Sequence, residues 1–165
     1  MRGARDGSKI AAVLHMAESE NVEAIVLNEL KEPIAAFRLR CGAALDGWSI
    51  IGSSRVHKFG GGIALMVRRR SRFNWHGGAQ MRQKGAEVVC LRGRYGATGV
   101  TLIGAYVTPN RSLTDTARVT KVTDTIRNNT LKAIASIAET ARERGDCVAL
   151  LGDLNIGFSD GRTVC

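Results

Sequence analysis

Proline and aromatic residues are scarce in this chain of 165 residues, which contains only 2 Pro and 5% aromatics. Together with 44% hydrophobic and 24% charged residues, this composition excludes the disordered, collagen-like and low-complexity classes. No apolar run approaches the roughly 20 residues that cross a bilayer, so we do not expect this chain to be an integral membrane protein. No long apolar stretch follows the charged first residues, so a secretory signal is not supported either. The length suits one ordinary domain with a sizeable core.

Two kinds of diagnostic motif are also missing. The loop GxxxxGK[ST] does not occur, which excludes a P-loop nucleotide hydrolase. The four cysteines form no CxxC pair, which argues against a zinc site or a disulfide framework and favours a reducing intracellular compartment. They are Cys41, Cys90, Cys147 and Cys165.

Positive charge, in contrast, is abundant and concentrated in one segment. The net charge is +9 at pH 7. The 40 residues from Arg55 to Arg94 contain ten basic residues and a single acid, Glu87, whereas the other 14 basic and 14 acidic residues cancel. A localised positive field attracts a polyanion, and nucleic acid is the commonest one. On charge alone, a solvated surface that keeps the protein soluble remains the alternative.

Helix and strand patterns alternate along the chain. Ser8 is a candidate N-cap for a helix with a regular apolar face, and a second, long helix is expected over residues 116–144 with Gly145 as its C-cap. The strands at 86–92 and 100–107 are expected to form a hairpin with a longer loop over residues 93–99. Short apolar runs predict further strands at 24–27, 48–51, 62–68 and 147–151, the first and last of them buried.

Polar residues follow three of these strands, where the side chains of a buried sheet emerge to meet ligands. Glu29 follows the first run, residues 106–110 (Tyr-Val-Thr-Pro-Asn) end another, and residues 152–155 (Gly-Asp-Leu-Asn) follow the last. In an extended chain Asp153 and Asn155 share one face. Gly152 would allow close approach of a ligand or a neighbouring strand. Each cluster alone is also explained as an ordinary strand exit.

In this order, the motifs resemble the endonuclease/exonuclease/phosphatase superfamily. Residues 23–29 (Glu-Ala-Ile-Val-Leu-Asn-Glu) are similar to its Asp-Ile-φ-x-Leu-Gln-Glu motif, where φ is apolar, and residues 61–67 resemble its glycine-led central strand. Residues 106–110 resemble its Tyr-x-Pro-Asn motif with one extra residue, and residues 148–155 match its Gly-Asp-x-Asn motif. The pattern is most similar to the apurinic-type endonuclease domains of non-LTR retrotransposons.

The resemblance implies an α/β fold: a two-sheet β-sandwich flanked by helices, as in DNase I-like proteins. It runs from about residue 10 to residue 155, within a single domain over 1–165. The family begins with a strand that carries a metal-site Asn and ends with a Ser-Asp-His motif. Neither motif is found here, since residues 159–161 read Ser-Asp-Gly and all three histidines come earlier. We therefore expect a partial domain, truncated at both ends.

The resemblance also implies a function: Mg²⁺- or Mn²⁺-dependent hydrolysis of phosphodiester bonds in DNA by an endonuclease that nicks it, in an intracellular, nuclear setting. Glu29 would hold the metal, Asp153 would orient or deprotonate the attacking water, and Asn155 would position the water or the phosphate. Tyr106 and Asn110 would donate hydrogen bonds to phosphate oxygens. The residues expected to bind the DNA backbone are Arg55, Lys58, Arg68, Arg69, Arg70 and Arg72.

Two alternatives stay open. A phosphoinositide or sphingolipid phosphoesterase would use the same fold on another anionic substrate. A non-catalytic nucleic-acid-binding remnant of a mobile element would explain both the missing motifs and the basic segment. The oligomeric state does not follow from the sequence.

Overall fold

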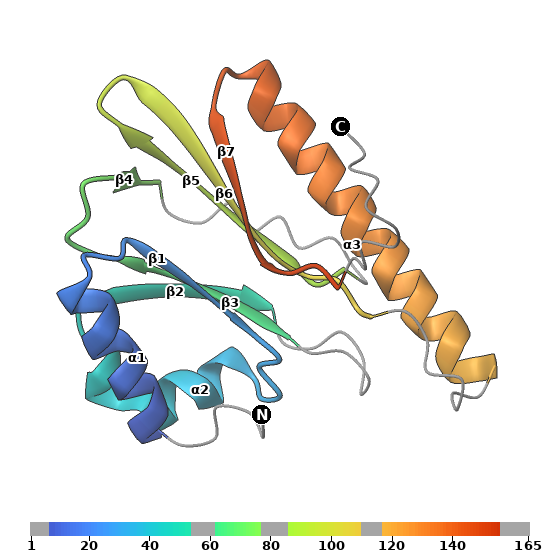
Figure 1. Ribbon diagram of the computed structural model, residues 1–165, viewed down its shortest axis with the longest axis horizontal. Coiled ribbons are helices and arrows are strands. Elements are labelled where there is room, and N and C mark those ends of the chain that lie inside the picture. Colours follow the sequence, from blue (N-terminus) through green and yellow to red (C-terminus); the bar gives the residue numbers. More distant parts are fainter. Residues whose placement is uncertain (1–6, 54–61, 77–85, 110–116, 156–165) are drawn as a thin grey trace.

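Two β-sheets pack face to face, and helices cover the outer side of each, so that the layers run helix, sheet, sheet, helix (Figure 1). The computed structural model describes residues 7–53, 62–76, 86–109 and 117–155. The expected two-sheet sandwich flanked by helices is therefore confirmed. No helix in these described ranges, the 27-residue α3 included, is long and apolar enough to span a membrane.

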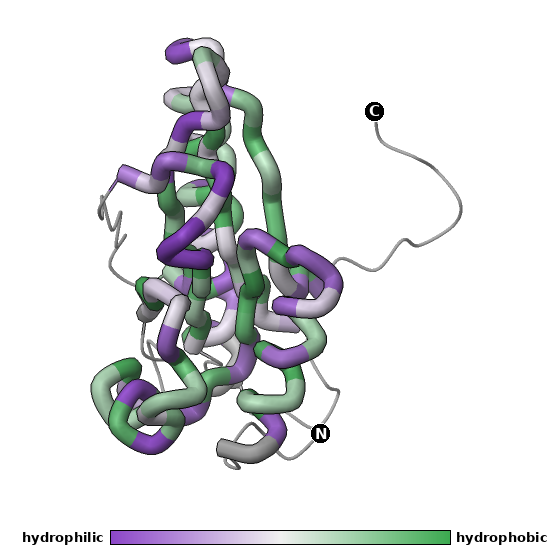
Figure 2. The backbone as a smooth tube through the Cα atoms, turned by 90° about the vertical axis from the view of Figure 1, so that its left-hand side faces the viewer, coloured by the Kyte–Doolittle hydropathy of each residue, from purple (hydrophilic) through white to green (hydrophobic). Residues whose placement is uncertain are grey.

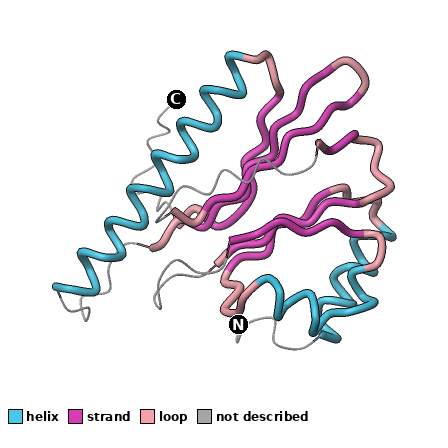
Figure 3. Tube along the Cα trace, turned by 180° about the vertical axis from the view of Figure 1, so that it is seen from behind, coloured by secondary structure: helices cyan, strands magenta, loops and turns pink. Residues whose placement is uncertain are grey.

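The first sheet is antiparallel with the strand order β1-β3-β2. Two helices and a 3₁₀ turn lie on its outer side (Figure 3), where Phe37, Trp48 and Met66 belong to one buried cluster. This layer consists of α1 (Gly7–Ser19), β1 (Ala24–Asn28), α2 (Ile34–Cys41), η1 (Gly42–Leu45), β2 (Trp48–Ser53) and β3 (Ile63–Arg68).

The second sheet has the order β4-β5-β6-β7, and its last pair, β6 and β7, is parallel. A parallel pair needs a crossover connection, which α3 provides. Ala133 and Ile137 of this helix pack against Cys90 and Ile103 on the outer face of the sheet. The elements are β4 (Asn74–Trp75), β5 (Val88–Tyr95), β6 (Thr98–Tyr106), α3 (Ala117–Glu143) and β7 (Cys147–Asp153).

The core between the sheets follows from the period of two along each strand. Ile63, Leu65 and Val67 of β3 face the second sheet, whereas Ala64 and Met66 face the helices. Both faces of β3 are buried, so its apolar run is continuous. Long apolar stretches likewise follow the strands of both sheets (Figure 2).

The expected hairpin forms, but its predicted longer loop is wrong. Tyr95 pairs directly with Thr98, so only Gly96 and Ala97 make the turn. Gly93, which we expected in the loop, lies inside β5, where it pairs with Trp75 and Val100. The ring of Trp75 packs against it, and a Cβ on Gly93 would come within 2.4 Å of that ring. This glycine serves packing rather than turning.

The predicted burial of two strands is also wrong. β1 is only half-buried, and most residues of β7 are exposed, Val148 and Leu150 each at 41%. Both are edge strands within the described part of the chain, β7 pairing with β6 alone. Apolar runs do not distinguish an edge strand from a central one. Three elements were not anticipated from the sequence: α2, η1 and β4.

Candidate catalytic edge of the sandwich

Three strands from the two sheets bring their carboxyl ends to one edge of the sandwich. The Tyr106 hydroxyl, at the end of β6, donates a hydrogen bond across the sheets to Glu29 Oε1 at 3.3 Å. Asp153, at the end of β7, pairs with Tyr106 in the parallel register. The Asn155 amide reaches Val107 just beyond β6. The residues predicted from separate motifs thus lie together, and we refer to Glu29, Tyr106, Asp153 and Asn155 as the candidate catalytic edge, or the catalytic edge for short.

Glu29 leaves β1 in a left-handed conformation, with φ of 57°. Non-glycine residues adopt this region rarely, and such strain clusters at functional sites. The next residue, Leu30, donates its N–H to Gly62 O at 3.2 Å, which fixes the turn. The Glu29 side chain is 46% exposed, and Lys31 Nζ lies 3.4 Å from its Oε2. Its carboxylate is therefore accessible, and its exposed partner is weakly held.

Gly152 allows β7 to end beside β6. Its φ is 132°, and a Cβ there would lie 1.9 Å from the Ala105 carbonyl oxygen, so only glycine fits. The expectation of close backbone approach at this residue is confirmed. The Val107 N–H then donates to Asp153 O at 2.9 Å. This contact places the Asp153 side chain next to the end of β6.

We had expected Asp153 and Asn155 to share one face of an extended chain, but they do not. The strand ends at Asp153, and Asn155 has φ of 44°. Its N–H donates to Asp153 Oδ1 at 3.1 Å, an Asx-type turn, and its side-chain amide donates to Val107 O at 2.9 Å. Asn155 therefore holds the Asp153 carboxylate in place instead of running parallel to it.

Tyr106 is buried at 6% exposure. Burial, followed by the negative charge and hydrogen bonding of Glu29 and then the charges of Glu87 and Asp153, raises the pKa of its phenol to about 12. A phenolate there would face three carboxylates, so the protonated form is strongly favoured. Tyr106 is consequently a hydrogen-bond donor at neutral pH.

Glu87 was missed from the sequence as a residue of this region. It is fully buried, and its Oε1 accepts the Gly62 N–H at 3.1 Å. Its carbonyl accepts the Tyr106 N–H at 3.0 Å, and its own N–H is bonded to Thr130 Oγ1 at 3.0 Å. Glu87 thus joins β3 of the first sheet to β6 and α3 of the second. An acid at the start of an apolar run was the signal that could have revealed it.

The donor set of the catalytic edge fits Mg²⁺ better than softer metals. Glu29 offers carboxylate oxygens, and the neighbouring Asn28 Oδ1 is buried without a hydrogen-bond partner in the described part of the chain. Mg²⁺ is bound through one or two carboxylates and retains several waters, so it does not require a full protein cage. Within the described ranges no three His, Cys, Asp or Glu side chains gather as such a cage.

Four of the arginines predicted to bind DNA, Arg68, Arg69, Arg70 and Arg72, lie away from this edge. β3 begins beside Asn28 and ends at Arg68, about 16 Å away at about 3.3 Å per residue. Arg68 Nη2 donates to Ala17 O at 2.9 Å, and Arg69 Nε donates to Trp48 O at 3.2 Å. Arg72 pairs with Glu23 at 3.1 Å. These side chains surround the opposite end of the first sheet, not the catalytic edge.

Three further predicted site residues, Arg55, Lys58 and Asn110, lie outside the described residues.

Comparison with known proteins places the chain by its fold. No family model and no curated protein matches the sequence. Among solved structures, TDP2 from C. elegans is 18% identical, with a TM-score of 0.57, over 92% of this chain and 43% of that one. The endonuclease domain of TRAS1, a telomere-specific non-LTR retrotransposon, is 14% identical, with a TM-score of 0.54, over 93% and 57%. D. rerio TDP2 complexed with single-strand DNA product is 13% identical, with a TM-score of 0.54, over 93% and 56%.

The chain spans about half the length of these structures. Nearly all of this chain aligns with them. This chain therefore has the fold of TDP2 and of the TRAS1 endonuclease domain, the DNase I-like two-sheet sandwich that the motifs had led us to expect.

Proposed function

We propose that this protein hydrolyses phosphodiester bonds in DNA with the help of Mg²⁺ or Mn²⁺. The observation that carries the proposal is the meeting of Glu29, Tyr106 and Asp153 at one edge, through a hydrogen bond between the sheets and the parallel register of β6 and β7. The two neighbours that favour this substrate are an endonuclease domain and a protein complexed with single-strand DNA product.

In this proposal Glu29, with Asn28 beside it, would hold the metal. When bound, the metal would supply charge stabilisation for the phosphate and the leaving oxygen. Glu29 is suited to this because its carboxylate is accessible at the end of a fixed strand. The exposed ion pair between Lys31 and Glu29 is weak, so a divalent ion could replace the Lys31 ammonium beside the Glu29 carboxylate.

Asp153 would act as general base. A water attacks phosphorus, its proton passes to the Asp153 carboxylate, and the bond to the leaving 3′-oxygen breaks. Asn155 orients Asp153 through the backbone N–H that it donates to Oδ1. Tyr106, protonated at neutral pH, would donate its hydroxyl proton in a hydrogen bond to a phosphate oxygen as negative charge develops.

Nicking of supercoiled plasmid tests the proposal. We expect Mg²⁺-dependent nicking that EDTA abolishes. Asp153→Asn keeps an oxygen for the Asn155 N–H but removes the base, so the rate should fall by about 10²–10⁴-fold. Tyr106→Phe should lower it by about 10²-fold. Glu20→Gln, an exposed acid at the end of α1, is the matched control and should nick at the parent rate.

Two other outcomes would replace the proposal. DNA binding without nicking under any metal would identify a non-catalytic nucleic-acid-binding protein. Phosphate release from phosphoinositide or sphingomyelin vesicles, with no nicking, would identify a lipid phosphoesterase of the same fold. Circular dichroism of each variant, matched to the parent, excludes misfolding as the cause of lost activity.

A further inference from the structure

Three adjoining hollows lie at the end of the first sheet opposite to the catalytic edge, and Arg69 lines all of them. The first is a hollow of about 490 Å³ between β2 and β3 of one sheet and the β4–β5 edge of the other. That size falls within the range of ligand sites. The second and third hollows, of about 350 and 510 Å³, flank Trp48.

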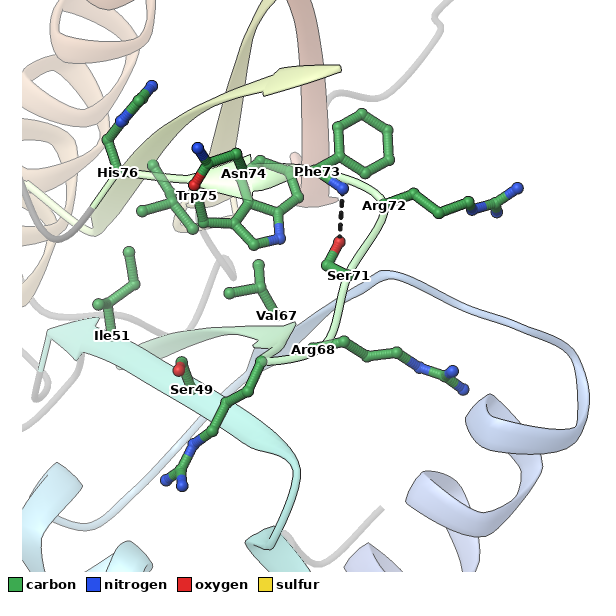
Figure 4. Close-up of a pocket in the computed structure, with 12 residues that line it drawn as sticks. Ser49, Ile51, Val67, Arg68, Ser71, Arg72, Phe73, Asn74, Trp75 and His76 are labelled. Atoms are coloured by element: carbon green, nitrogen blue, oxygen red, sulfur yellow. Dashed lines mark hydrogen bonds between the residues drawn. The ribbon is translucent and has the colours of Figure 1, made fainter. Parts of the chain in front are cut away.

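The wall of the first hollow is partly apolar and partly polar, and one buried polar group faces it. Ile51, Val67 and Leu91 provide the apolar surface. The Trp75 Nε1–H is buried without a hydrogen-bond partner in the described residues. In Figure 4 the ring nitrogen of Trp75 faces the space above Val67. An unpaired buried donor costs free energy unless a ligand supplies the acceptor.

Trp75 is held rigidly in that position. Its ring stacks on Phe73 with centroids 5.0 Å apart and an interplanar angle of 15°. Phe73 in turn contacts Tyr95 at 5.3 Å, and the Phe73 N–H is bonded to Ser71 Oγ at 3.0 Å. Gly93 lies against the indole. Phe73 and Gly93 thus cover parts of the indole, and its N–H edge is turned toward the hollow.

The rim of the hollows carries a strong positive charge. Arg68 and Arg72 extend outward on the same side of the first hollow (Figure 4). Glu18 and Asp46 are the acids among the residues lining the three hollows, and Glu23 nearby is paired with Arg72. The arginines of this rim are Arg38, Arg68, Arg69, Arg70 and Arg72.

We infer that this end of the sandwich is a second, non-catalytic site that binds single-stranded nucleic acid. The arginine rim neutralises successive phosphates, and the first hollow accepts one unpaired base. The Trp75 N–H donates to a carbonyl oxygen on the edge of that base, and the apolar walls contact its ring. A duplex satisfies the rim but not the hollow, because its bases are stacked and their edges are paired.

Binding of a fluorescently labelled single-stranded oligonucleotide, followed by anisotropy in EDTA, tests the inference without any catalysis. We expect binding that weakens with salt and a clear preference over a hairpin duplex of equal charge. Arg69→Ala/Arg70→Ala leaves the Arg72–Glu23 pair intact. It should weaken binding at least tenfold and reduce the salt slope by about 0.7 for each phosphate that the protein no longer neutralises.

The matched control is Lys132→Ala/Arg142→Ala, which removes two exposed charges from α3 and should change binding little. Trp75→Phe keeps the stack with Phe73 but removes the N–H, and should weaken single-strand binding by roughly two- to tenfold with no effect on duplex. Asp153→Asn should lose nicking but keep the preference for the single strand and the salt slope of the parent, so that loss of nicking and loss of this site are separable.

Three results would overturn the inference. The first is a duplex that binds as tightly as the single strand, and the second is polyglutamate of the same charge that does so. The third is an equal loss of single-strand affinity in the Arg69→Ala/Arg70→Ala and Lys132→Ala/Arg142→Ala variants. A second readout is available because the chain has only 2 Trp. In a Trp48→Phe background with circular dichroism matched to the parent, Trp75 is the sole tryptophan, and its selectively excited emission should be quenched by the single strand but not by the duplex.

Discussion

Asp146 shows how a single buried carboxylate connects distant parts of this chain. It follows α3 and is buried at 8% exposure. It accepts hydrogen bonds from Arg92 at 2.9 and 3.0 Å, from Thr101 at 2.9 Å and from Arg144 at 3.3 Å. These donors lie on β5, on β6 and just after α3. One side chain therefore fixes the end of the helix against the hairpin.

This arrangement predicts a pH-dependent stability. The hydrogen bond from Arg92 first, and those from Thr101 and Arg144 besides, outweigh burial and lower the pKa of Asp146. A carboxyl group whose pKa is lower in the folded state stabilises the fold above its unfolded pKa, about 3.9, and this contribution is lost as the pH falls through the folded value. Asp146→Asn should therefore cost about 2 kcal/mol at pH 7.

Denaturant unfolding at a series of pH values checks this prediction. The difference between the parent and Asp146→Asn should shrink as the pH falls below about 4. A difference that stays constant across the pH range would show that the carboxylate charge is not the source of stability. Glu139→Gln, an exposed acid on α3, is the control of equal charge change.

The residue types of the catalytic edge could be recognised from the sequence, but their contacts could not. Glu29, Tyr106 and Asp153 each follow an apolar run, which is visible without a structure. The left-handed turn at Asn155 is not, because Asn tolerates both extended and left-handed conformations. The role of Glu87 also escaped notice, because an acid at the start of an apolar run does not show which groups it will contact.

At the scale of the elements, the end of β7 determines where Asp153 stands. Gly152 approaches the Ala105 carbonyl so closely that no side chain fits between the strands. Gly152→Ala should lower the free energy of unfolding by about 2–3 kcal/mol, through backbone strain and weaker pairing of β7 with β6 next to it.

Gly96→Ala is the matched control for this change. Its φ is also positive, at 58°, but nothing lies within 4 Å of the added Cβ. Only the left-handed conformation then costs free energy, about 1 kcal/mol. Urea denaturation of both variants measures the difference. Equal losses would mean that the close approach of Gly152 to β6 is not tight in solution.

Helices and strands with a clear hydrophobic period could be located from the sequence, but which strands lie at the edge of a sheet could not be predicted. α1, α3 and the apolar strands were expected at their observed places. The exposure of β7 was not, because Val148 and Leu150 carry the same apolar signature in a central or an edge strand. β4 is only two residues long, Asn74 and Trp75, too short to give any periodicity.

At the scale of the whole molecule, Glu87 is the residue that fastens the two sheets together beside the catalytic edge. Its side chain holds Gly62, whose carbonyl holds Leu30 next to Glu29, and its backbone holds Tyr106. Its charge also contributes to the raised pKa of Tyr106. Glu87 is thus a positioning residue that acts on both halves of the edge.

Glu87→Gln separates charge from structure, because the amide oxygen can still accept the Gly62 N–H. We expect the pKa of Tyr106 to fall from its raised value while the fold persists. Glu87→Ala should in addition cost about 1–3 kcal/mol, since Gly62 N–H loses its acceptor.

Tyrosinate absorbance during alkaline titration measures this shift. The chain has only 2 Tyr, and Tyr95→Phe leaves Tyr106 as the sole titrating phenol. Glu139→Gln, an exposed acid on α3, should not move the titration. An unchanged titration in Glu87→Gln would show that its carboxylate does not act on Tyr106.

The hydrogen bonds of the catalytic edge also indicate when this edge forms during folding. The hydrogen bond from Tyr106 to Glu29 joins residues 77 positions apart, and that from Asn155 to Val107 joins residues 48 apart. Contacts of such long range form only after a large loss of chain entropy. An intermediate with only the first sheet would contain Glu29 alone, and one with only the second sheet would contain the other three residues of the edge. A nascent chain would therefore have no assembled catalytic edge until β7 had emerged and paired with β6.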